Sequence, residues 1–67
     1  MTLERARQVL QTQVGFGRGY NRQGARLILA EIERAHDQPA VDGLIRELEL
    51  EPVFGFTPGT SFASRNP

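Results

Sequence analysis

The chain has 67 residues, eight basic and eight acidic side chains, and no cysteine. A domain of this length buries only about 60% of the surface that its unfolded chain exposes, so its stability margin is small. The composition excludes disulfides and thiolate metal sites, and the zero net charge is unlike the strong positive field of dedicated nucleic-acid binders. We expect an all-α protein with three short helices packed as a small antiparallel bundle, followed by an irregular aromatic tail. The helices are expected at about residues 3–14, 22–36 and 39–50.

The first helix is predicted to begin after Thr2, whose hydroxyl can accept an early backbone N–H. Its apolar residues recur at spacings of three and four and therefore fall on one face. They are Leu3, Ala6, Leu10 and Val14. The opening MTLERARQVL carries charge too early for a secretory signal, and no apolar run approaches the roughly 20 residues that span a bilayer. We therefore expect a cytoplasmic location and no membrane partner.

Residues 14–26, VGFGRGYNRQGAR, are rich in glycine, arginine and aromatic residues and interrupt the helical pattern. Glycines ahead of a helix can cradle a phosphate with their backbone N–H groups. The spacing does not fit such a loop, because a dinucleotide fingerprint follows a strand and a Walker loop needs a lysine, which this chain lacks. We interpret the segment first as a hinge and second as a recognition surface, and we expect no cofactor.

Asn21 is the predicted N-cap of the second helix. A short HDQP turn connects the end of the second helix to the third helix. The stripe of the second helix consists of Ala25, Ile28, Leu29, Ile32 and Ala35, and that of the third of Val41, Leu44, Ile45 and Leu48. Pro39 falls in the first turn of the third helix, where its missing N–H costs nothing. Pro52 is predicted to end that helix. A connection this short makes the two helices antiparallel neighbours.

Arg18, Arg22 and Arg26 line the entrance of the second helix, where they repel one another and oppose the helix dipole. One interpretation is that the acidic end of the antiparallel third helix neutralises them. That end carries Glu47, Glu49 and Glu51. The first two helices would neutralise another set of charges in the same way. This set consists of Arg5 and Arg7 with Glu31, Glu33 and Asp37.

The other interpretation of the arginine cluster is an external anionic partner. Nucleic-acid phosphates would pair with Arg18, Arg22 and Arg26. Tyr20 or Phe16 would stack on bases. The helix-turn-helix outline of the second and third helices does not strengthen this, because the helix that would enter the major groove is acidic. Any DNA contact would have to use these arginines.

No catalytic or metal site is expected. The chain has a single histidine, and its two serines are not backed by a general base with an orienting acid. His36 lies at a helix end, where the dipole favours an imidazolium, and we expect it to cap that end.

The aromatic tail, residues 53–67, follows a helical domain at residues 1–52. Thr57-Pro58-Gly59-Thr60 fits a type II turn, and we expect the last few residues to be disordered. Two leucines point away from the stripes of their helices and, with the tail phenylalanines, would form a second apolar patch. The patch consists of Leu27, Leu50, Phe54, Phe56 and Phe62. It forms an interface, or the tail folds back and covers the leucines within one chain.

These features predict a small non-enzymatic protein–protein interaction module. It would act as a homodimer, or as an accessory factor that docks on a larger partner through this patch. The alternative is a nucleic-acid-binding regulator that uses the arginine cluster around the glycine-rich hinge.

Overall fold

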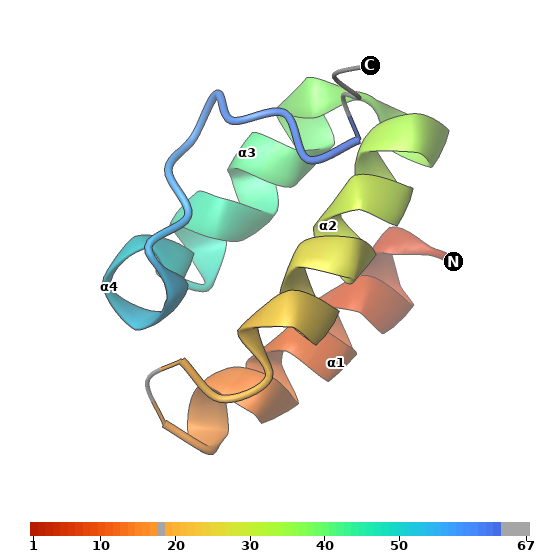
Figure 1. The fold of residues 1–67 in the computed structure, drawn as a ribbon. Coiled ribbons are helices and arrows are strands. Elements are labelled where there is room, and N and C mark those ends of the chain that lie inside the picture. Colours follow the sequence, from red (N-terminus) through yellow and green to blue (C-terminus); the bar gives the residue numbers. More distant parts are fainter. Residues whose placement is uncertain (18, 64–67) are drawn as a thin grey trace.

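The computed structural model describes residues 1–17 and 19–63. Its helices are α1 (Leu3–Gly15), α2 (Arg22–His36), α3 (Gln38–Glu47) and α4 (Leu50–Phe54). α1, α2 and α3 run antiparallel to their neighbours along the chain, and the tail after α4 returns toward the C-terminal end of α2 (Figure 1). The predicted all-α antiparallel bundle is confirmed.

α1 begins as the sequence predicts. Thr2 Oγ1 accepts a hydrogen bond from the backbone N–H of Arg5 at 3.0 Å, so the predicted N-cap is present. Ala6 and Leu10 are fully buried, because their spacing of four residues places both on the face that contacts α2.

The hinge between α1 and α2 contains two glycines at positive φ, Gly17 at 112° and Gly19 at 72°. Other residues rarely adopt these angles, so glycine permits the chain to reverse here. Gly19 N also donates to Val53 O at 3.0 Å, which ties the hinge to α4. Asn21 occupies the predicted N-cap position, but its side chain makes no capping hydrogen bond, because its φ of 52° is left-handed and not the extended conformation of most N-caps.

The third predicted helix is divided in two, and Pro52 does not end it. α3 ends at Glu47, Glu49 adopts a left-handed φ of 53°, and α4 begins at Leu50 with Pro52 in its first turn. A proline inside a helix has no N–H for the carbonyl four residues earlier, here that of Leu48, and its ring clashes with that carbonyl. The helix therefore breaks at residues 48–49, where a new first turn can accommodate the ring.

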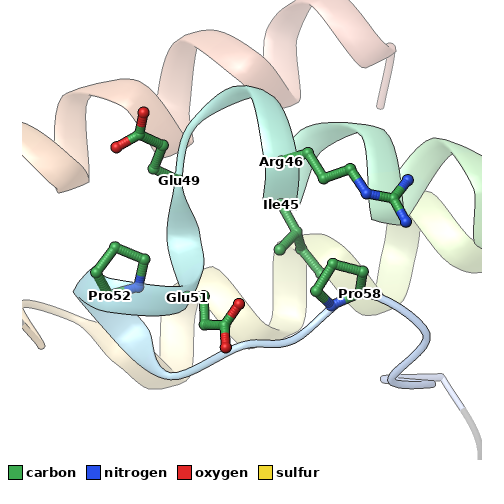
Figure 2. A pocket seen from close by; sticks show the side chains of 6 residues that line it. All are labelled: Ile45, Arg46, Glu49, Glu51, Pro52 and Pro58. Carbon is green, nitrogen blue, oxygen red and sulfur yellow. The ribbon is translucent and has the colours of Figure 1, made fainter.

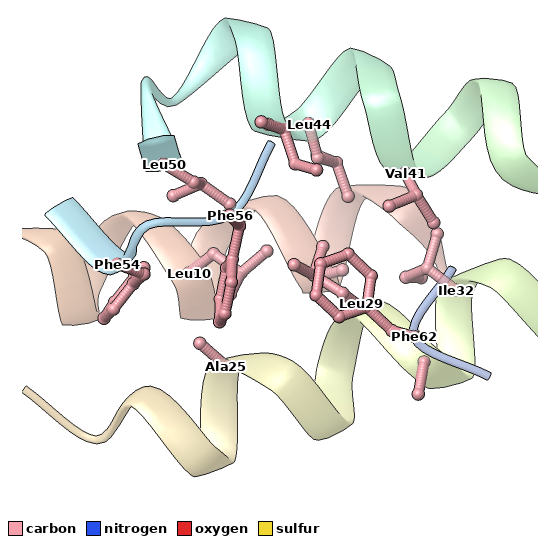
Figure 3. Packing of buried hydrophobic residues seen from close by; sticks show 13 residues of the cluster. Leu10, Ala25, Leu29, Ile32, Val41, Leu44, Leu50, Phe54, Phe56 and Phe62 are labelled. Carbon is pink, nitrogen blue, oxygen red and sulfur yellow. The ribbon is translucent and has the colours of Figure 1, made fainter. Parts of the chain in front are cut away.

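The tail packs on the bundle of its own chain as far as Ala63. Phe56 is 3% exposed and Phe62 is 8% exposed, and both belong to the single core cluster drawn in Figure 3. The predicted turn is present, since Thr60 N donates to Thr57 O at 3.2 Å and Gly59 has the positive φ, 90°, that a type II turn needs. Residues 64–67, for which disorder was expected, lie outside the described residues.

Candidate functional site

The predicted apolar patch is not a surface of the folded chain. Leu50, Phe54, Phe56 and Phe62 are all buried in the core, whereas Leu27 is 68% exposed on α2. The break at residues 48–49 explains why Leu50 is buried, because it rotates Leu50 away from the orientation that a continuous helix would give it. Of the two alternatives for the tail, the structure has the fold within one chain, where Leu27 is the member of the five that stays exposed.

Arg22 and Arg26, at the start of α2, contact the end of α4 and the tail and not the acidic end of α3. Arg22 Nε donates to the carbonyl of Phe54 at 2.7 Å, and the guanidinium lies 4.9 Å from the ring centre of Phe56. Arg26 lies over the ring of Phe62 at 5.7 Å. The carbonyls of the last helical turn have no partner within their helix, so the end of α4 offers Arg22 an acceptor. The predicted pairing with the glutamates is therefore wrong for both arginines, and Arg18 lies outside the described residues.

The predicted charge pairs between α1 and α2 are also wrong. Arg7 pairs with Glu47 at the end of α3 at 2.8 Å, and with Glu4 at 3.1 Å. Glu31 pairs instead with the amino group of Met1, at 2.9 Å. The prediction failed for Glu31 because it considered charged side chains alone. The N-terminal amino group is also a cation, and it reaches Glu31 on α2. His36 lies at the end of α2, but the contact of its Nε2 is with the carbonyl of Met1, at 3.5 Å, and not the predicted cap of its own helix.

Glu33 on α2 is the main anchor of the tail, a role that sequence reasoning missed. Its carboxylate accepts hydrogen bonds from Ser61 Oγ at 2.6 Å and from the backbone N–H groups of Phe62 and Ala63 at 2.7 and 3.2 Å. The hydrogen bond from Ser61 lowers the pKa of Glu33 most, the two backbone hydrogen bonds lower it further, and desolvation opposes them. No local spacing signals these contacts, because they join residues about thirty positions apart.

Asp42 on α3 holds the tail at the turn. Its Oδ1 accepts from the N–H of Gly59 at 2.8 Å and from Gln38 Nε2 at 2.9 Å. These hydrogen bonds, that of Gly59 foremost, lower the pKa of Asp42. Gln38 Nε2 donates also to the carbonyl of Thr60 at 2.8 Å. The polar side chains at the start of α3 therefore bind the tail backbone.

The larger of two surface hollows lies beside the hinge, along α1 and the N-cap of α2, and has a volume of about 540 Å³. Phe16 and Tyr20 form its aromatic end, with ring centres 4.7 Å apart and exposed fractions of 63% and 51%. The other lining residues come from α1 and from the N-cap of α2. They are Arg5, Gln8, Val9, Thr12, Gln13 and Asn21.

A smaller hollow of about 350 Å³ lies between the end of α3, α4 and the tail turn (Figure 2). Its floor is Ile45, and the two prolines beside it come from α4 and from the tail turn. Glu49, Glu51 and Arg46 stand around the rim, and within residues 1–17 and 19–63 none of these three forms an ion pair. The hollow thus has an apolar floor and a mostly acidic rim, which is unsuited to an anion.

No helix in the described ranges is long and apolar enough to cross a membrane. Comparisons with protein-family models, with characterised proteins and with solved structures found no match to this chain. The groove beside the hinge is the candidate site, because it is the larger of the two hollows and is lined by exposed aromatic side chains.

Proposed function

We propose that this protein is a non-enzymatic protein–protein interaction module that acts as a homodimer. The alternative within this class is an accessory factor that docks on a larger partner. The contact surface is the groove beside the hinge, and not the patch predicted from the sequence. The cytoplasmic location stays a prediction.

The exposed aromatic pair is the observation that supports this proposal most. Most of Phe16 and half of Tyr20 remain in water, on a domain that buries its other phenylalanines. Covering such a side chain completely contributes about 1.5–3 kcal/mol, and aromatic residues are enriched in the binding hot spots of protein interfaces. The amide and hydroxyl side chains around the groove supply the polar rim of such an interface.

A nucleic-acid-binding regulator is the second candidate, since the same aromatic pair could stack on bases. Its electrostatic support is weaker. Arg22 and Arg26 contact the carbonyl and rings of the tail, and Arg5 is the one basic residue of the described chain that lines the groove. A neutral chain with few phosphate contacts binds nucleic acid weakly and loses that binding as salt rises.

Sedimentation equilibrium of the full chain over a wide concentration range, at low and high salt and with or without a short DNA duplex, separates the two candidates. We expect a monomer–dimer equilibrium that the duplex does not change. A chain that stays monomeric at every concentration, and gains mass only with the duplex at low salt, would refute the proposal and support the regulator.

A further inference from the structure

The groove carries a pattern that fits a second copy of this chain, an inference that rests on the proposed function and specifies its partner. The groove-lining residues of α1 and of its C-cap, Phe16, occupy sequence positions that are symmetric about the midpoint between residues 10 and 11. They pair as Arg5 with Phe16, Gln8 with Gln13, and Val9 with Thr12. A two-fold axis at that point would bring each residue to the level of its counterpart on an antiparallel helix.

The central residues of this face also have the spacing of a helix–helix seam. Arg5, Val9, Thr12 and Phe16 follow one another at intervals of four, three and four, which keeps them on one stripe of α1. This stripe is distinct from the face of Leu10, which is fully buried in the core. The same helix can therefore pack against α2 and against a partner at once.

The two ends of the stripe are chemically complementary. Arg5 is exposed, and no residue of the described chain pairs with its guanidinium. Phe16, whose ring lies 4.7 Å from that of Tyr20 at a tilt of 39°, offers an exposed aromatic face. A guanidinium within about 6 Å of such a ring is attracted by its quadrupole. Arg5 and Phe16 stand about 16 Å apart along one straight helix, at 1.5 Å per residue, so they cannot meet within one chain.

We propose that two copies of the protein form a two-fold symmetric dimer in which their α1 helices pack antiparallel. Arg5 of each copy lies over Phe16 of the other, and Val9 contacts Thr12 at the centre. Arg5 has no ion-pair partner among the described residues, and Phe16 and Tyr20 are largely exposed. The two-fold axis then creates the Arg5–Phe16 contact twice, once at each end of the paired helices.

Disulfide cross-linking tests this geometry directly, because the chain has no cysteine of its own. Arg5→Cys and a mass-tagged Phe16→Cys are oxidised separately and as an equimolar mixture. In the antiparallel register, the mixed pair brings the two sulfurs together and retains the second Arg5–Phe16 contact intact. Each variant alone holds its sulfurs about 16 Å apart along the helices, beyond the roughly 7 Å between Cα atoms that a disulfide spans.

We expect the disulfide in the mixture and neither variant to cross-link alone. The matched control is a mixture of Gln11→Cys with Phe16→Cys, since Gln11 is exposed on α1 outside the groove. Cross-linking of Arg5→Cys with itself would show a parallel dimer and overturn the inference, as would equal yields from the test and control mixtures. In both cases a parent chain that sediments as a dimer leaves the proposed function standing, whereas a monomeric parent refutes both.

A second measurement uses the strength of the dimer. Phe16→Ser should raise the dimer dissociation constant by about tenfold or more, because both symmetric contacts lose their ring. Leu27→Ser makes a similar change at a side chain that is 68% exposed on α2 and should leave the constant unchanged. Equal effects of the two variants, or none from Phe16→Ser with its helical content intact, would overturn the inference.

Discussion

Replacing Glu33 with glutamine tests how strongly the tail is held to the bundle. The change preserves the shape of the side chain and removes its charge. Hydrogen bonds to a charged group contribute about 1.5–3 kcal/mol, against about 0.5–1.5 kcal/mol for neutral ones. Glu33 accepts three, but two of them share one oxygen and the one from Ser61 is exposed. We therefore expect Glu33→Gln to lower the free energy of unfolding by about 1–2 kcal/mol, well below the sum over three independent bonds.

The effect should depend on pH in a defined direction. Because the tail hydrogen bonds lower the pKa of Glu33 in the folded state, its contribution is complete above the pKa of the unfolded chain, about 4.3 for glutamate. It is lost as the pH falls through the lower folded pKa. The difference between parent and variant should therefore be constant from neutral pH down to about pH 5 and should shrink below about pH 4.

Thermal unfolding followed by circular dichroism at 222 nm measures the difference. A loss of 1–2 kcal/mol lowers the Tm of so small a domain by about 5–15 °C. Glu31→Gln is the matched control, because it makes the same change two residues away and removes only an exposed ion pair with the terminal amino group. Equal Tm losses for the two variants, or a Glu33→Gln deficit that persists undiminished in acid, would refute the role of Glu33 as the tail anchor.

Three further variants test the core, the turn and the arginine contact. Phe56→Ala should cost about 3–5 kcal/mol and leave most of this small domain unfolded at 25 °C, seen as a loss of helical circular dichroism. Gly59→Ala, at a φ of 90°, should lower the urea midpoint by the equivalent of about 1 kcal/mol. Arg22→Met should cost about 1 kcal/mol through the lost hydrogen bond to Phe54, and this cost should change little with salt, whereas an ion pair would weaken as salt rises.

The sequence predicted the parts of the fold that depend on local periodicity. α2 spans the predicted residues, and α1 extends only one residue beyond its predicted end. Pro52 was correctly identified as incompatible with a continuous helix, but its effect was placed at the wrong residue. A proline perturbs the carbonyl four positions earlier, so the break falls near Leu48, and Leu50 turns into the core.

The contacts of the charged residues could not be predicted in the same way. The expectation that charges neutralise one another across antiparallel helices assigned Arg22 to an acidic partner, because the helices are the parts of this chain whose register the sequence pattern reveals. The irregular tail has no such register, and its path determines which polar side chains meet its backbone. Arg7 did find a glutamate, Glu47, but on α3 and not on α2.

The need of the tail backbone for hydrogen-bond partners explains which groups the polar side chains of α2 and α3 contact. A segment without regular structure cannot pair its own N–H and carbonyl groups, and groups left unpaired on burial destabilise the fold. Here the side chains of Arg22, Glu33, Gln38 and Asp42 hydrogen-bond the backbone between Phe54 and Ala63. The polar residues of α2 and α3 that face the tail are thus occupied within one chain, whereas Arg5 on the far side of α1 is not. An additional partner is therefore best sought at α1.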